Sequence, residues 1–495
     1  MLLGNVSGEY TYRNIGLTLM APDYEVISHM IGVCKNFGIE YNIIDPDNPK
    51  SIGLNPFVYD DSSKIAITIS AVIKSMYNTA HHDVNEAYKE DIAMQAIENL
   101  AILLKEIYPK MNEGKLPNLE DMLKMFTNFD LIEKMCKILE HDIENDPVKK
   151  EKYHVLLEYF KKNFYHDAPA KSNIEKYIYS VTSQLDNLLR IPGIKGILCN
   201  RYDNLNFDKM LLNSEVTFVC TRRGDLGETA HKAFGLFFLL LMQQAILARP
   251  GNDSTRIPHF LYIDDFPAYI CKATEPIYTL YRKYNVATVL DSQNLTQLKG
   301  DLSADPRGDY YKNLILSNTV NKLIFGNATP EDVAWWETAM QDKREWTFNN
   351  TYNADKTEYD PKKGNIEYKW KANFAKGKIM ALKGKQVIYK VKDLGGKSAV
   401  NKGKVDFMEA KYKDVQKVKK YNFTKFGGSL LDPESAARKA LDKKEVDYSA
   451  VTSSNDNYDI DREVDPIQTD TSDSKYLFDN EDAIVVNFKG KKKTN

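Results

Sequence analysis

The sequence predicts an α/β fold with a parallel sheet, an inserted all-α domain and a small β-rich C-terminal extension. Three observations predict it. Residues 14–60 have the pattern strand, helix, strand; residues 62–190 show helical periodicity throughout; and strands alternate with helices again after residue 190. A strand–helix–strand unit of this length joins parallel strands. At about 100–200 residues per domain, 495 residues suffice for about three domains.

The first part of the sheet domain is expected within residues 1–61. NIGLTLMAP (14–22) is apolar, like a buried strand. DYEVISHMIGVCKNFG (23–38) has an acidic start, apolar residues at helical spacing and a closing glycine, which is typical of a helix. IEYNIIDPD (39–47) is a second apolar strand, and a Pro-bearing loop (53–61) follows it.

Residues 62–190 are predicted to form the all-α domain. About five segments with apolar residues at helical spacing follow one another, and PNLED (117–121) has the composition of a helix start. Since strand patterns precede and follow this region, we expect it to be an insertion between strands of one sheet.

Residues 191–348 are predicted to be the second part of the sheet domain. Strands are expected at 215–223, 258–267, 286–295 and 321–327, and helices at 229–250, 275–285 and 329–340. The longest apolar run, 233–241, is too short to cross a bilayer and is interpreted as part of a buried helix, so no transmembrane segment is predicted in this chain.

The C-terminal third has a different composition. We expect a basic β-rich extension at 349–425, with strands in 378–393 and 404–412, and a polar, acidic, disordered tail at 426–495. The formal net charge of -2 conceals a strong asymmetry. Residues 341–440 hold 24 Lys+Arg against 12 Asp+Glu, whereas the residues before and after them are net acidic. Such a distribution hints at a polyanionic partner.

Five scattered cysteines without a CxxC pair argue against a disulfide scaffold or a zinc ribbon, and for a reducing compartment.

The strongest local signal for chemistry is PHFLYIDDFP (258–267). An apolar strand that ends in two carboxylates is typical of a Walker B motif. Asp264 would then orient Mg²⁺ through water, and Asp265 would polarise the attacking water. The alternative is a strand that ends in an ordinary polar turn.

Two further strand ends carry candidate catalytic side chains. Gln293 lies at the end of the strand and turn expected at 286–295 and could contact a γ-phosphate, although turn chemistry explains it as well. Arg222 and Arg223 end the strand at 215–221, where an arginine could stabilise transition-state charge in a neighbouring subunit. The alternative for these arginines is a surface salt bridge.

Several basic residues are candidates for DNA binding. Arg282 and Lys283 form either a solvated helix face or DNA contacts. The basic stretch 361–425 interleaves lysines with aromatic residues, which fits either a nucleic-acid surface or a solvated Lys-rich extension. Its candidate lysines are Lys369, Lys371, Lys376 and Lys378.

A phosphate-binding loop of the form GxxxxGK[ST] does not occur in the sequence. The nearest match, GNVSGE (4–9), has the wrong spacing, and a glutamate stands where a lysine would contact phosphate.

The order of these motifs resembles that of the TraG/TraD-type coupling ATPases of conjugative type IV secretion, within the FtsK-like superfamily of P-loop motors. The resemblance extends from about residue 14 to about residue 415. FLYIDDFP is similar to the family's DEFP motif, and LYRKYNVATVLDSQNLTQL to its RKYGV…QSLSQL segment, which places Gln293 and Gln297 on family positions.

This resemblance implies a RecA-like motor domain that binds ATP and Mg²⁺ and hydrolyses ATP. It also implies DNA, relaxase or relaxosome proteins and other type IV secretion subunits as partners. A homo-hexamer in the intact machine, and a cytoplasmic location at the inner face of the cell membrane, are expected as well.

The sequence departs from the family in two ways. The family's phosphate-binding loop should precede residue 14, and Asp265 stands where the family has a catalytic glutamate. Three hypotheses follow: a coupling motor subunit or the C-terminal part of one, a channel-assembly ATPase of the same system, and an adaptor that keeps the motor fold without hydrolysing ATP. Whether the chain is an enzyme stays open at this point.

Overall fold

The structure is a computed structural model of the chain. It describes residues 15–407, apart from 60, 77–83, 253–254, 303–305, 341, 350–364 and 393–395, together with 484–485. Apart from 484–485, the acidic tail predicted at 426–495 lies outside the described residues.

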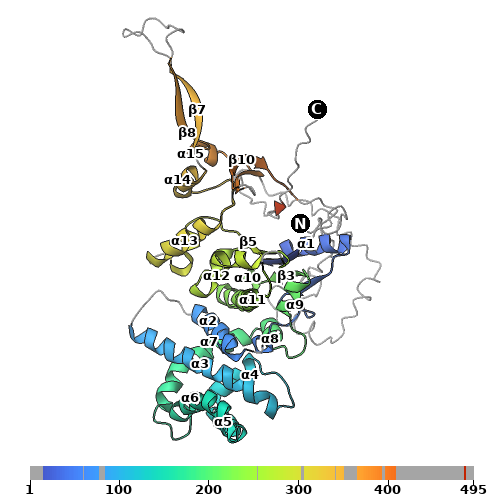
Figure 1. Cartoon of the computed structure of the whole chain (residues 1–495), viewed down its shortest axis with the longest axis vertical. Coiled ribbons are helices and arrows are strands. Elements are labelled where there is room, and N and C mark those ends of the chain that lie inside the picture. Colours follow the sequence, from blue (N-terminus) through green and yellow to red (C-terminus); the bar gives the residue numbers. More distant parts are fainter. Residues whose placement is uncertain are drawn as a thin grey trace, which may run out of the picture. The chain divides into compact units, whose positions relative to one another are not determined.

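A five-stranded parallel sheet forms the centre of the chain (Figure 1). Its strands are β1 (Gly16–Ala21), β2 (Tyr41–Ile44), β3 (Val216–Cys220), β4 (His259–Ile263) and β5 (Val286–Leu290), in the spatial order β2-β3-β1-β4-β5. All four pairings are parallel, which confirms the predicted α/β class.

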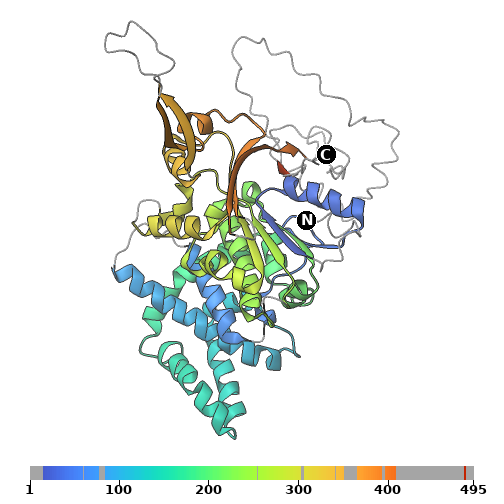
Figure 2. The same cartoon turned by 45° about the horizontal axis from the view of Figure 1, so that its top comes forward.

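Two helices cover opposite faces of the sheet (Figure 2). α1 (Tyr24–Phe37) packs Ile27 and Ile31 against β1 and β3, and it ends at Gly38, whose φ of 64° suits glycine. α11 (Glu228–Ala248) is buried against the other face. α1 lies in the connection from β1 to β2, and α11 lies in the connection from β3 to β4. These two connections cross the sheet in opposite directions, so right-handed crossovers place the two helices on opposite faces.

α11 is the one helix in the described part of the chain that is long and apolar enough to cross a membrane. In this fold, 72% of its apolar window is buried inside the protein. Its composition is therefore that of a core helix, as the sequence predicts.

The helical region contains six helices among the described residues, where the sequence suggested about five. They are α2 (Ser62–Met76), α3 (Val84–Met111), α4 (Leu119–Thr127), α5 (Phe129–Ile143), α6 (Pro147–Asn163) and α7 (Lys171–Leu189). α2 packs against both α3 and α11, so it joins the helical region to the sheet. The short helices η2 (Pro56–Val58), α8 (Pro192–Leu198) and α9 (Phe207–Leu212) lie in the connections to the sheet.

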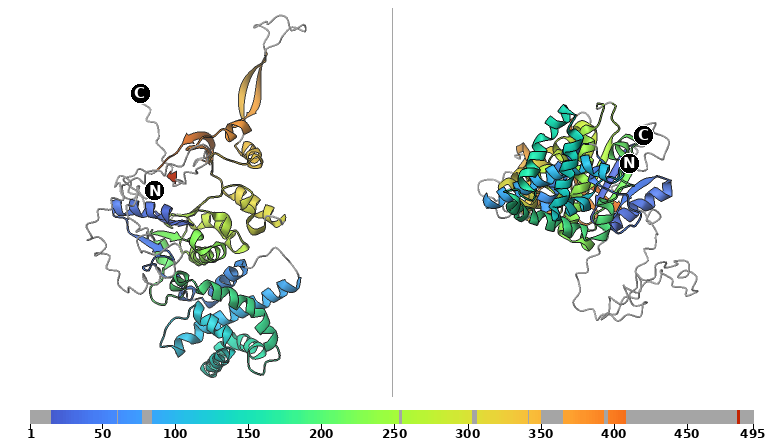
Figure 3. Two further views of the ribbon diagram at one scale, coloured as in Figure 1. Left: turned by 180° about the vertical axis from the view of Figure 1, so that it is seen from behind. Right: turned by 90° about the horizontal axis from the view of Figure 1, so that it is seen from below.

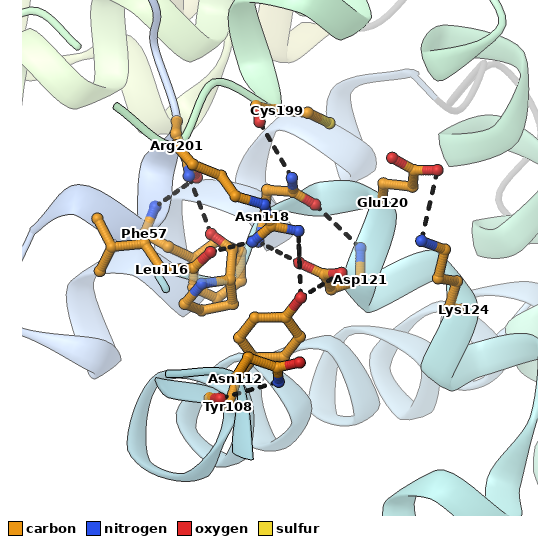
Figure 4. Close-up of polar contacts among 12 residues, drawn as sticks. Phe57, Tyr108, Asn112, Leu116, Asn118, Glu120, Asp121, Lys124, Cys199 and Arg201 are labelled. Atoms are coloured by element: carbon orange, nitrogen blue, oxygen red, sulfur yellow. Dashed lines mark hydrogen bonds and ion pairs between the residues drawn. The ribbon is translucent and has the colours of Figure 1, made fainter. Parts of the chain in front are cut away.

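A polar network fixes the start of α4 to the segment that returns to the sheet (Figure 4). Asn118 and Asp121 form a reciprocal capping box at the α4 N-terminus, and the Asn118 amide donates to the Cys199 carbonyl at 3.0 Å. Arg201 Nη2 lies 2.7 Å from Asp121 Oδ2 and 3.2 Å from the Tyr108 hydroxyl. The network therefore ties two segments that are about 80 residues apart.

The single helix expected at 275–285 is two short helices instead. After β4 come η3 (Phe266–Tyr269), η4 (Lys272–Thr274), α12 (Pro276–Thr279) and η5 (Tyr281–Tyr284). β5 is followed by η6 (Gln297–Leu302) and α13 (Pro306–Asn318), and the strand β3 by α10 (Arg223–Leu226).

A smaller antiparallel sheet follows α13, in the order β10-β9-β6. It consists of β6 (Lys322–Ile324), β9 (Gln386–Lys392) and β10 (Ser398–Lys404), packed on α14 (Pro330–Ala339) and α15 (Lys376–Met380). Two expectations are corrected here. The strand expected at 321–327 belongs to this smaller sheet, and the first residues of the strand expected at 378–393 belong to α15.

A long antiparallel hairpin of β7 (Asp342–Asn349) and β8 (Asn365–Ala372) extends from the same region (Figure 3). The short strands β11 (Asp406–Phe407) and β12 (Ile484–Val485) complete the described elements.

Candidate active site

A cleft of about 550 Å³ opens at the carboxyl edge of the parallel sheet. It collects residues that directly follow four strands, because the ends of parallel strands meet at one edge. The residues that line it are Pro22, Asp23, Arg223, Gly224, Glu228, Asp264, Asp265, Asp291 and Gln293.

Asp264 follows β4 and forms a carboxyl pair with Asp291, which follows β5. The Asp264 N–H donates to the Met20 carbonyl at 3.0 Å, so the backbone on which this carboxyl stands is held by the neighbouring strand. Desolvation and the Asp291 charge raise the pKa of Asp264 to about 6, and desolvation also raises the pKa of Asp291. The pair therefore holds a proton far more readily than isolated carboxyls do.

Asp265 has a left-handed backbone conformation with φ 54°, which is uncommon for a non-glycine residue. Its carboxylate forms an ion pair with Arg223, and Arg223 also contacts Glu228 at 2.7 Å. The Asp265 side chain is 16% exposed and the Arg223 side chain 45%. In this conformation the carboxylate predicted to polarise water is paired with a cation of its own chain.

Arg222 does not line the cleft. Its guanidinium makes two 2.8 Å hydrogen bonds to the Asp45 carboxylate after β2, and it stacks on the Tyr24 ring at 4.7 Å. Asp45 is 1% exposed, and the Asp45 contact raises the pKa of Arg222 further. Of the two predicted arginines, Arg223 is the one that the fold brings to the cleft.

Gln293 lines the cleft, as the sequence suggested. Its N–H donates to the Gln297 side chain at 3.2 Å, so the two glutamines of the motif resemblance are in contact. Sequence reasoning missed Asp291, although it is the first polar residue after an apolar strand, like Asp264. It also missed Asp23 after β1 and Glu228 at the start of α11.

The predicted DNA-binding residues lie outside the cleft. Arg282 and Lys283 are exposed on η5. Lys376 and Lys378 are exposed on α15, and Lys371 is exposed at the end of β8. Lys369 lies on the same strand, and the Trp370 side chain between these two lysines is 61% exposed.

The donor atoms of the cleft suit a hard cation better than an anion. Carboxylate oxygens are the ligands that Mg²⁺ prefers, and Mg²⁺ usually keeps several waters when one or two carboxylates hold it. No group of three or more His, Cys, Asp or Glu residues poised to bind a metal is found in the described residues. Five carboxylates face the single guanidinium of Arg223, so the described lining by itself does not fit a triphosphate.

Comparisons with known proteins bear on the fold. No protein-family model matches the sequence, and no curated protein matches it. Among solved structures, the conjugative coupling protein TrwBΔN70 in an unbound form superposes with a TM-score of 0.51 at 13% identity, over 80% of this chain and 78% of that one. A TrwB complex with an ATP analogue scores 0.49 at 13% identity, over 80% and 79%.

VirB4 of Thermoanaerobacter pseudethanolicus scores 0.37 at 14% identity, over 80% and 83%. The TrwBΔN70 match, at a TM-score of 0.51, shows that this chain shares the fold of that coupling protein.

Proposed function

We propose that this chain is the motor subunit of a conjugative type IV secretion system, or the C-terminal part of one, and that it couples ATP hydrolysis to the transfer of DNA or nucleoprotein. One observation carries the proposal. In a fold shared with a coupling protein, Asp264, Asp265 and Gln293 gather in one cleft at the carboxyl edge of the sheet. This edge is where parallel α/β sheets bind ligands.

Each residue has a role that its position suits. The Asp264–Asp291 pair would hold Mg²⁺ through water, since its carboxyl groups are adjacent and face the cleft. Asp265 would orient the attacking water once Arg223 releases it, and Arg223 would then be free to contact phosphate. When bound, Mg²⁺ neutralises phosphate charge and ATP supplies the transferred phosphoryl group.

The described cleft lacks a lysine to hold the β- and γ-phosphates. We infer that a phosphate-binding segment from outside the described residues completes the nucleotide site. The DNA sequence upstream of the first codon tests this. An in-frame GxxxxGK[ST] within about fifty residues, the size of a strand-plus-helix step, is expected. Stop codons in every upstream frame would contradict this inference.

Phosphate release by the purified chain tests hydrolysis itself. We expect turnover only when the phosphate-binding segment is present, and faster turnover in Asp265→Glu, whose longer side chain matches the resemblance. The matched control is Asp225→Glu, an acidic residue on α10 that does not line the cleft. Absence of turnover in the completed chain and in Asp265→Glu would refute the motor proposal.

The second candidate is a non-hydrolysing adaptor, and the acidic lining of the cleft favours it. An adaptor would bind protein partners through the fold while its cleft stays free of nucleotide. Equilibrium binding of a fluorescent ATP analogue to the chain completed with the phosphate-binding segment separates the two, since the adaptor shows none at any Mg²⁺ concentration. The other proposed partners are relaxase or relaxosome proteins, further secretion subunits and identical subunits in a hexamer at the inner membrane face.

A further inference from the structure

The turn that presents Gln293 to the cleft is closed by hydrogen bonds of its own residues. The Gln293 N–H donates to Gln297 Oε1 at 3.2 Å, and the Gln297 N–H donates to Asn294 Oδ1 at 2.9 Å. The Ser292 hydroxyl donates to the Asn294 carbonyl at 2.7 Å. Because these bonds join residues at most four positions apart, the turn is a local unit. The place of Gln293 in the cleft therefore depends on what holds this turn from outside.

One hydrogen bond joins the turn to the small lobe, the name used here for β6, β9 and β10 with α14 and α15. The Leu295 N–H donates to Asp332 Oδ2 at 3.1 Å, across 37 positions of the chain. Asp332 lies in the first turn of α14 and is 5% exposed. A hydrogen bond to a carboxylate removed from water is stronger than one between neutral groups. The contact therefore restrains the turn against the helix.

The sequence around Asp332 is that of a local helix cap. Thr329 caps α14 by accepting the Asp332 N–H at 3.2 Å, and an acid at this third helical position commonly reaches back to the N–H of the capping residue. Here Asp332 Oδ2 is turned to Leu295, which follows a strand of the main sheet. The carboxylate thus has a tertiary contact that capping of α14 does not explain.

α14 is packed against both sides of the junction. Val333 and Met340 are buried in the core of the small lobe. Trp336 packs against that core, whereas the neighbouring Trp335 packs against the main hydrophobic core of the sheet and the helical region. The two indole rings meet edge to face, with their centroids 4.9 Å apart. A displacement of the turn at Leu295 is therefore transmitted to a helix that belongs to the small lobe.

We propose that Asp332 is a positioning residue for Gln293, and that its bond to Leu295 couples the cleft to the small lobe. A change in the cleft that moves the turn then acts on α14. By linkage, a partner that moves α14 acts on Gln293 with the same coupling free energy. The role of Gln293 toward phosphate rests on the proposed function, whereas the coupling between the turn and α14 does not.

Hydrogen exchange of the full chain without nucleotide tests the contact. In Asp332→Ala the Leu295 amide loses its acceptor, and we expect its exchange to become about ten-fold faster, which corresponds to about 1.4 kcal/mol. Asp332→Asn keeps an acceptor oxygen and should restore a rate close to that of the parent chain. Glu331→Ala is the matched control, since Glu331 is an exposed acid of the same helical turn, and it should leave the rate unchanged.

A second substitution tests the coupling. Gln297→Ala removes the acceptor of the Gln293 N–H and so loosens the turn on the side of the cleft. We expect it to speed the exchange of α14 amides about three-fold in the parent chain and to have no effect on them in the Asp332→Ala background. Thr296→Ala, at an exposed position of the same turn, is the control and should leave α14 unchanged in both backgrounds.

Three results would overturn the proposal. One is an unchanged Leu295 rate in Asp332→Ala. Another is equal acceleration in the turn and in peptides that cover residues 379–388 of the small lobe, which would assign Asp332 a role in folding alone. The third is the same effect of Gln297→Ala in both backgrounds. A coupling that persists while the completed chain shows no ATP turnover would instead refute the motor proposal and support this one.

Discussion

At the scale of single residues, the cleft holds more negative charge than its surroundings neutralise. Asp264 and Asp291 are adjacent, and desolvation raises the pKa values of both. An unfolded aspartate titrates near pH 3.9, so the unfolded chain loses this proton before the folded chain does. The Asp264 charge therefore lowers the free energy of unfolding as the pH rises above about 3.9. This destabilisation reaches its full size once the pH passes about 6.

The destabilisation by the Asp264 charge at neutral pH gives a prediction for the stability of Asp264→Asn. The variant should gain stability relative to the parent chain as the pH rises from 4 to 7, by roughly 1–3 kcal/mol, because the amide stays neutral. Urea unfolding at several pH values measures the difference. Asp203→Asn, in an exposed turn, serves as the control with a constant difference. A pH-independent difference for Asp264→Asn would contradict the desolvated pair.

At the scale of elements, the junction of the helical region depends on one desolvated ion pair. Asp121 is 6% exposed and Arg201 20%, and Asp121 also closes the capping box of α4. Removing one partner of a buried pair leaves a desolvated charge, which costs far more than the loss of a surface pair. The junction is thus held by a few polar contacts rather than by apolar area alone.

Arg201→Ala should therefore lower the free energy of unfolding by about 3–5 kcal/mol. The matched control is Arg190→Ala, which removes an exposed pair with Asp186, where the side chains are 72% and 40% exposed. That control should cost less than about 1 kcal/mol. Similar losses in the two variants, measured by chemical denaturation, would show that the network in Figure 4 adds nothing beyond a surface pair.

At the scale of the whole molecule, charge is separated along the chain. The segment 341–440 has 12 more basic than acidic residues, and its described part includes the β7–β8 hairpin and α15. The cleft and the segment before it are acidic. A DNA duplex would therefore be attracted to the C-terminal region and repelled from the rest.

Salt titration of DNA binding checks this. Replacing Lys376 and Lys378 by glutamine should reduce the slope of log K against log salt by about 1 for each phosphate group that the variant no longer neutralises. Lys149 and Lys150, exposed at the start of α6 in the helical region, give the matched control pair with an unchanged slope. Equal slopes in all variants would exclude α15 from the DNA interface.

Much of the fold could be predicted from sequence because its signals are local. The apolar run of β4 followed by two carboxylates, and the apolar face of α1 closed by Gly38, are visible within about fifteen residues. The cleft was predictable in part for the same reason, since Asp264, Asp265 and Gln293 follow strands. Asp291 follows a strand too, but nothing local shows that its carboxyl faces that of Asp264.

The sequence by itself determined the α/β class, the strands of the parallel sheet, the core helix α11 and the separation of charge, since each depends on neighbours in the chain. Only the tertiary structure decided the strand order and the place of β6 in a second sheet. It also decided that Arg223 lines the cleft whereas Arg222 does not. Arg222 is held by Asp45, a partner 177 residues away. Pairings over such distances depend on which surfaces fold against each other, and the local pattern of residues carries no record of that choice.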